Sequence, residues 1–197
     1  MGIDSTLPPK KTTRREPELI WQLKITLADS KPPIWRRIQV PGSISLYKLH
    51  VIIQIAMPWS NSHLYEFQVG EVDYGDPSPE VDYPLKSARR IKLSEAAPAP
   101  KAKISYTYDF GDNWEHAIVV EKILAPEPGV HYPVCLKGVR AAPPDDCGGI
   151  WGYADFVAAI QDPEHAEHDE LLEWIGGKWD PEAFDLEGTN AELQQIK

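Results

Sequence analysis

The sequence has few sulfur-containing residues and no long apolar run. Its 197 residues include only two cysteines and two methionines. Two cysteines cannot supply the disulfide framework of a small secreted domain, and both are expected to be reduced thiols. No stretch approaches the roughly 20 apolar residues that a membrane helix needs, and the N-terminus lacks the apolar segment of a signal peptide. These absences predict a cytoplasmic protein that does not enter a membrane.

Basic residues are scarce where a nucleic-acid-binding surface would need them. Residues 150–197 contain two basic and 12 acidic residues, a net charge of −10 that equals the net charge of the whole chain. The segment 1–17 contains four basic and two acidic residues with several prolines, which is typical of a flexible arm. Without a dense Lys/Arg stripe, direct nucleic-acid binding is disfavoured. A protein or a small molecule is the expected partner.

The sequence does contain the apolar and aromatic residues of a folded domain. Hydrophobic residues make up 42% of the chain, and seven residues are tryptophan. A chain of this length can bury roughly 70% of the surface that it exposes when unfolded. We expect a single domain over residues 18–197, with a sheet core at 18–125 and a loop and acidic helical cap at 126–197.

Hydrophobic periodicity predicts an α+β fold. Ser45 can cap a helix over 45–57 whose apolar residues fall on one face. Arg36 shares the side of the apolar residues in its strand, so it must find a partner. Strand, strand, helix is the opening order of a β-grasp-like sheet. The expected strands of this mixed or antiparallel sheet lie near 19–28, 34–40, 64–69, 104–110 and 114–124.

The clearest hairpin turns at Gly111-Asp112-Asn113. Alternating aromatic and apolar residues precede this turn, and the same alternation continues after it. With a three-residue loop, Phe110 faces Trp114 and Tyr108 faces His116 across the two strands. The hairpin is therefore expected to bring its aromatic residues and His116 to one buried face.

This hairpin carries the first candidate site. Asp109, Asp112 and His116 could converge to hold a divalent metal ion or to perform general acid-base catalysis. His63 precedes another strand, and it could share a ligand with His116 if the two strands are neighbours. The alternative is structural, because aspartates commonly satisfy turn amides and a buried histidine often packs in a core.

The cysteines form the second candidate site. Cys135 and Cys147, with His131, offer the thiolate and imidazole ligands that zinc prefers. Structural zinc sites usually pair ligands two to four residues apart, whereas these cysteines are 12 residues apart. The alternative is that both cysteines act as small buried apolar residues.

Two further aspartates precede a predicted helix. Asp145 and Asp146 are followed by Gly148 and Gly149, and helical periodicity begins near Trp151. The Lys and Ser/Thr of a phosphate-binding loop are missing from this segment. We therefore expect the two aspartates to satisfy the free amides of the helix N-terminus.

Several separate motifs occur in one order along the chain. They are Lys31-Pro-Pro-Ile-Trp-Arg-Arg37, Tyr108 to His116, Pro143-Pro-Asp-Asp-Cys-Gly-Gly149 with Trp151-Gly-Tyr153, Asp162-Pro-Glu-His165 and Trp179-Asp-Pro-Glu182. Together they resemble the plasmid pRiA4b ORF-three family over about residues 18–195. The resemblance implies a domain of unknown function found in bacterial, archaeal and mobile-element proteins, with some relatives labelled as an insertion-element passenger resolvase. This chain lacks the nucleophile amid clustered arginines that a recombinase needs.

Three functions are compatible with these observations. The first is a protein- or small-ligand-binding module in mobile-element or host housekeeping. The alternative is a metal-dependent, hydrolytic enzyme that uses His63, Asp109, Asp112 and His116. This alternative is weakened by Tyr65 and Ala142, where many members of the resembled family have His and Cys. The third is a DNA-associated accessory protein, which only the mobile-element setting of the resembled family favours.

Overall fold

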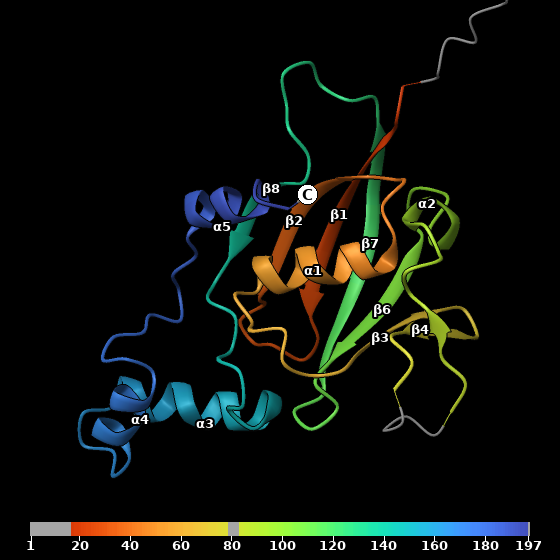
Figure 1. Cartoon of the computed structure of the whole chain (residues 1–197). Coiled ribbons are helices and arrows are strands. Elements are labelled where there is room, and N and C mark those ends of the chain that lie inside the picture. The colour runs from red at the N-terminus through yellow and green to blue at the C-terminus, as the bar shows by residue number, and fades with distance from the viewer. Residues whose placement is uncertain (1–16, 79–82, 197) are drawn as a thin grey trace, which may run out of the picture.

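An eight-stranded sheet forms the centre of the computed structural model, which describes residues 17–78 and 83–196 (Figure 1). The strand order is β5-β4-β3-β6-β7-β1-β2-β8, and every neighbouring pair is antiparallel except β4 and β5. The predicted α+β class with a mixed sheet is therefore confirmed. The predicted arm over 1–17 lies outside the described residues except for its last residue. The strands are β1 (Ile20–Leu27), β2 (Trp35–Pro41), β3 (Tyr65–Val69), β4 (Val72–Gly75), β5 (Lys86–Ser87), β6 (Lys103–Tyr108), β7 (Trp114–Leu124) and β8 (Val134–Val139).

The two faces of the sheet differ in chemistry because side chains alternate along each strand. In β1, Leu23 and Ile25 are fully buried on the face that α1 (Leu46–Ala56) covers (Figure 1). The opposite face carries a polar network in which Arg37 and Gln22 both donate to Glu121. The core therefore lies between the sheet and α1.

The helix α1 begins where the sequence predicts. The side chain of Ser45 accepts a hydrogen bond from the Lys48 amide at 3.2 Å, which satisfies one of the free amides of the first turn. The apolar stripe that includes Leu46, Leu49 and Ile53 is fully buried. Together, β1, β2 and α1 fix the position of the loop that connects α1 to β3.

Two stretches without clear periodicity also form regular elements. The interval 126–148, expected to be a loop, contains β8, which pairs with β2 at the edge of the sheet. The Asn190 side chain accepts from the amide of Cys135 at 2.8 Å and donates to its carbonyl at 2.9 Å, and so pairs one residue on the outer edge of β8. Tertiary contacts rather than alternation stabilise this strand. The interval 70–103 contains β4, β5 and the short helix α2 (Leu93–Ala96).

Arg36 is fully buried and ties three elements together. Its Nε donates to the carbonyl of Ala56 at the end of α1 at 2.7 Å, and its Nη1 donates to the carbonyls of Trp35 and Val139 at 3.0 and 3.1 Å. Its guanidinium lies over the ring of Phe184, 4.1 Å from the centroid. The partner that the sequence required is therefore a set of carbonyls and an aromatic ring.

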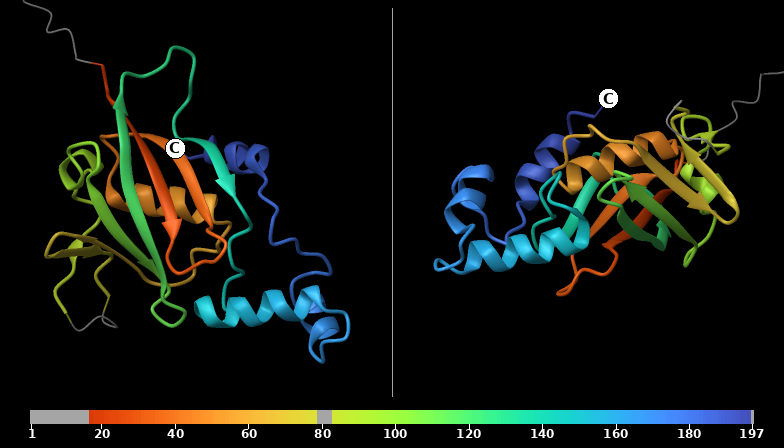
Figure 2. Two further views of the ribbon diagram at one scale, coloured as in Figure 1. Left: turned by 180° about the vertical axis from the view of Figure 1, so that it is seen from behind. Right: turned by 90° about the horizontal axis from the view of Figure 1, so that it is seen from below.

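The C-terminal helices lie beside the sheet rather than across it. The helices α3 (Gly149–Gln161) and α4 (His168–Trp174) pack together at one end of the molecule, and α5 (Leu186–Leu193) returns to β8 (Figures 1 and 2). No helix in the described part of the chain has the length and apolarity required to span a membrane. The loop that enters α3 passes the ends of the central strands, where it meets two other loops.

Candidate functional site

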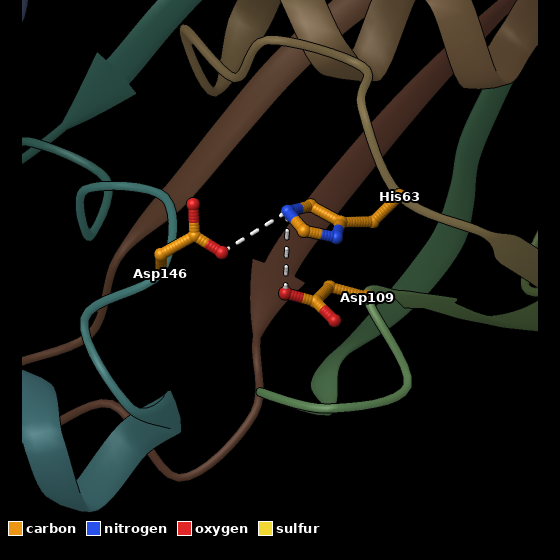
Figure 3. Close-up of side chains that lie close together, drawn as sticks. All are labelled: His63, Asp109 and Asp146. Carbon is orange, nitrogen blue, oxygen red and sulfur yellow. Dashed lines mark ion pairs between the residues drawn. The ribbon is translucent and has the colours of Figure 1, made fainter.

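Three loops bring one histidine and two aspartates together at the end of the sheet (Figure 3). His63 lies between α1 and β3, Asp109 begins the turn between β6 and β7, and Asp146 belongs to the loop before α3. Their side chains point toward one another (Figure 3). One ligand atom from each residue lies within 4.8 Å of the other two.

One of the two distances from His63 falls in the range of ligands around one metal ion, and the other is slightly longer. Nε2 of His63 lies 3.2 Å from Oδ1 of Asp146 and 3.7 Å from Oδ2 of Asp109. Nitrogen and oxygen ligands about 2.0 to 2.2 Å from zinc, at angles of roughly 90 to 110°, lie about 3.0 to 3.5 Å apart. Nε2 is nonetheless buried without a hydrogen-bond partner among the described residues, because the carboxylates approach it outside hydrogen-bond geometry.

The backbone of both aspartates is in the left-handed region, with φ of 55° at Asp109 and 60° at Asp146. Aspartate tolerates this region better than most residues, and such conformations are frequent at functional sites. Oδ1 of Asp109 accepts the amide of Gly111 at 2.9 Å. This bond leaves Oδ2 directed toward His63 (Figure 3).

The loop that carries Asp146 is fastened to the other two loops. Oδ2 of Asp145 accepts the amide of Ser60 at 2.8 Å, and the indole of Trp59 donates to the carbonyl of Pro143 at 2.9 Å. Oδ2 of Asp112 accepts the amide of Gly148 at 3.2 Å. These bonds hold Asp146 near His63 although its own side chain is 70% exposed.

A closed ring of hydrogen bonds supports the loop that carries His63. Nε2 of His50 donates to Oδ1 of Asn61 at 2.6 Å, so Nδ1 accepts from the Tyr106 hydroxyl at 2.8 Å. Gln54 completes the ring, because it donates to Tyr106 and accepts from the Asn61 amide. Burial lowers the pKa of His50 to about 4, so this histidine is neutral near pH 7.

His63 belongs to the walls of two cavities. One of about 430 Å³ is lined by residues that include Ser62, Leu64, Asp109 and Phe110. The other, of about 210 Å³, is lined by His50, Asn61, Tyr65 and Arg89 together with His63. A ligand or water molecule could therefore approach the group of His63, Asp109 and Asp146 from solvent.

The sequence predicts two of these three residues. His63 and Asp109 were candidates, whereas Asp146 was expected to satisfy the amides at the start of α3. In the structure Asp112 accepts the amide of Gly148, and Asp145 accepts an amide from another loop. The role expected of Asp145 and Asp146 at the start of α3 is therefore taken by Asp112. In the sequence, the one indication of a site role for Asp146 was that it lies in the family motif that begins at Pro143.

His116 lies apart from this group. It is 2% exposed on β7, and its Nδ1 donates to the carbonyl of Tyr106 at 3.3 Å. His63 precedes β3, and β6 separates β3 from β7, so the condition under which His63 and His116 could share a ligand is not met. Burial lowers the pKa of His116 to about 4. This histidine is a packed, neutral core residue, which is the structural alternative that the sequence left open.

The hairpin register also differs from the prediction. Tyr108 faces Trp114 and Tyr106 faces His116, so the loop has five residues rather than three. The cause is the backbone of Asp109, whose φ of 55° turns the chain out of the β6–β7 ladder and whose carbonyl accepts the Asn113 amide at 2.6 Å across the loop. The longer loop directs Asp109 toward His63. Phe110 is 39% exposed instead of facing Trp114.

The two cysteines are free and belong to different parts of the fold. Cys135 is buried on β8, and its thiol donates to the carbonyl of Lys137. Burial raises the pKa of both thiols, and that of Cys147 reaches about 12. Within the described residues, neither cysteine joins a group of three possible metal ligands. The described residues therefore do not bring Cys135, Cys147 and His131 together as the candidate zinc site would require.

Comparison with known proteins agrees with the motif order. Residues 19–188 match the family described as "Plasmid pRiA4b ORF-3-like protein". The chain belongs to this family. It is 42% identical over 178 residues to the uncharacterized protein y4hQ of Sinorhizobium fredii (strain NBRC 101917 / NGR234), across 89% of this chain and 91% of that protein. The crystal structure of a protein of unknown function, MM3350 from Methanosarcina mazei Go1, is similar with a TM-score of 0.79 and 39% identity, across 87% of this chain and 97% of that one. Since these relatives have no assigned function, the family supplies the fold, and the site must supply the chemistry.

Proposed function

We propose that this protein binds a divalent metal ion through His63, Asp109 and Asp146 and uses it in a hydrolytic reaction. The observation that carries the proposal is the position of Nε2 of His63, which lies between two carboxylate oxygens without a hydrogen-bond partner among the described residues. A metal ion bonded to Nε2 and both oxygens would satisfy all three atoms. A protonated histidine paired with two aspartates is the competing explanation.

The residue types favour a catalytic rather than a structural ion. Three protein ligands leave at least one coordination position for water, whereas structural zinc sites are closed by four ligands. One imidazole and two carboxylates suit zinc, manganese or iron, and none requires a thiolate. The cavities beside His63 give a substrate access to the remaining positions. Such an ion lowers the pKa of bound water and supplies a nucleophile at neutral pH.

Metal binding is tested by calorimetric titration of tag-free, metal-free protein with Mn²⁺ and Zn²⁺. One ion should bind per chain, and His63→Ala should weaken its affinity by about 100-fold, the upper part of the range for altered metal sites. His131→Ala is the matched control, since His131 is exposed and lies outside the group. Equal affinities of the wild type and His63→Ala would overturn the proposal.

A substitution in α3 should lower the affinity for the same metal ion indirectly. A Cβ at Gly152 would lie 2.0 Å from the carbonyl oxygen of Cys147, so Gly152→Ala must displace the loop that carries Asp146. Metal affinity should fall about tenfold, as for residues that orient ligands. Ala158→Gly on the exposed side of α3 should lower helix stability by about 0.5 to 1 kcal/mol and leave metal affinity unchanged. A Gly152→Ala protein with wild-type metal affinity would show that the loop does not position Asp146.

A further inference from the structure

We infer that a second cavity, between the β1–β2 turn and α3, binds a small aromatic carboxylate. The turn and the start of α3 lie side by side in both views of Figure 2. The cavity measures about 570 Å³, and its walls include Lys31 from the turn, Arg140 after β8, and Ile150, Trp151, Tyr153 and Val157 from α3. Two family motifs, which begin at Lys31 and at Pro143, thus contribute to one cavity that does not include the proposed metal ligands.

Unsatisfied donors in the wall point to an anionic ligand. Nη1 of Arg140 pairs with Glu182, but Nε is buried without a hydrogen-bond partner in the described part of the chain. The Tyr153 hydroxyl lies against the Arg140 side chain, which is its one hydrogen-bonding neighbour in that part of the chain, so its O–H is free to donate to a ligand. Arg140 and Tyr153 are only 8% and 6% exposed, so bulk water does not readily satisfy these donors and leaving them unpaired is unfavourable. A carboxylate in the cavity would accept from these groups.

Other groups support the same charge preference. Lys31 is exposed and forms no ion pair within residues 17–78 and 83–196. Arg140 has a φ of 67°, a conformation that is uncommon for a long side chain and frequent at ligand sites. The competing carboxylates belong to Asp29, which is exposed, and to Glu182, whose side chain is 65% exposed. Both acids are hydrated, so they neutralise the buried guanidinium incompletely.

The apolar side of the cavity selects an aromatic body for the ligand. Trp151 is 84% exposed on the first turn of α3, although a free indole surface is costly in water. Ile150 and Val157 are half-buried on the same helix. An aromatic ring packed on Trp151 is stabilised by ring–ring attraction beyond the burial of its area. The ring and the carboxylate would thus engage opposite walls.

The probe is benzoate, with uncharged benzamide of the same shape as its comparison. Titrations followed by NMR use the full chain with a chelator present and are repeated in His63→Ala, so that benzoate bound to a metal ion is not counted. Benzoate should bind saturably. The affinity for benzamide should be lower by about tenfold or more, since charge-assisted hydrogen bonds are lost. Unchanged binding in His63→Ala would separate this site from the proposed metal site.

Exposed positions provide variants that should not affect folding. Lys31→Glu and Trp151→Ala should each lower the affinity for benzoate about fivefold or more. Glu182→Gln should raise this affinity about two- to fivefold, because it removes the competing carboxylate. The matched controls are Lys137→Glu for the charge change and Leu136→Ala for the loss of an exposed apolar side chain; both positions lie outside the cavity and should have no effect. No saturable binding, equal affinity for benzamide, or wild-type affinity in both Lys31→Glu and Trp151→Ala would overturn the inference.

Discussion

The free energy of unfolding is expected to fall by several kcal/mol as the pH drops from 6.5 toward 4. Burial lowers the pKa of His50 and of His116 from 6.5 to about 4. Between these values the unfolded chain binds two protons that the folded chain does not bind, so the folded state is disfavoured as pH falls. Each histidine contributes about 1.4 kcal/mol per pH unit within this window. Above pH 6.5 neither contributes, and below about 4 the contribution levels off.

Urea unfolding of metal-free protein between pH 7.5 and 5 measures this slope before most carboxylates titrate. His116→Leu should remove about half of it, because only His50 then remains buried and titratable. Variants His131→Ala and His165→Ala should retain the full slope, since both residues are exposed. A stability that is flat over this range would mean that His50 and His116 become protonated without unfolding.

Elements defined by local pattern were predictable, whereas those defined by long-range contacts were not. The alternation in β1 and the cap at Ser45 are local, and both appear where the sequence places them. The strand β8 has no clear alternation and depends on β2 and on Asn190, which is 55 residues beyond Cys135. The hairpin loop depended on the left-handed backbone of Asp109, whose amide is bonded to Leu64, a residue 45 positions earlier. A sequence cannot show such a partner until the fold is known.

The candidate site follows the same division. His63 and Asp109 were predictable because an imidazole and a carboxylate at strand ends are suited to metal chemistry. Asp146 was not, because an aspartate before a helix is more often a cap. Its role depends on Asp112, 34 residues away at another loop, which accepts the helix amide in its place. Because Asp112 accepts the helix amide, the carboxylate of Asp146 remains available to the site.

The loop from Ala141 to Gly149 connects the two proposed sites. At its centre Asp146 contacts His63, and at its ends lie Arg140 and the first turn of α3, which line the second cavity. Because this loop is bonded to the loops of both Ser60 and Asp112, a displacement at one site would be transmitted along a constrained backbone. Benzoate titration of Gly152→Ala would therefore report whether the second cavity depends on the same loop position.

Arg36→Met is expected to destabilise the fold by about 3 to 5 kcal/mol, as when a buried polar network loses its central member. Methionine fills similar space but leaves the carbonyls of Ala56 and Val139 without their donor in the core. The guanidinium stays charged near neutral pH, since burial lowers the pKa of Arg36 only to about 10. Its charge is stabilised by the carbonyl end of α1, where a helix dipole favours a cation.

Arg37→Met is the matched control for Arg36→Met because it changes the same residue type one position along the strand. Arg37 pairs with Glu121 on the open face, where the two side chains are 30% and 22% exposed. Such a pair contributes about 0 to 1 kcal/mol, so urea unfolding should separate the two variants clearly. If Arg36→Met matches Arg37→Met in stability, burial of the methionine must offset the lost hydrogen bonds, as can happen when a buried charge is replaced by an apolar side chain. Arg36 would then contribute to the specificity of the fold rather than to its stability.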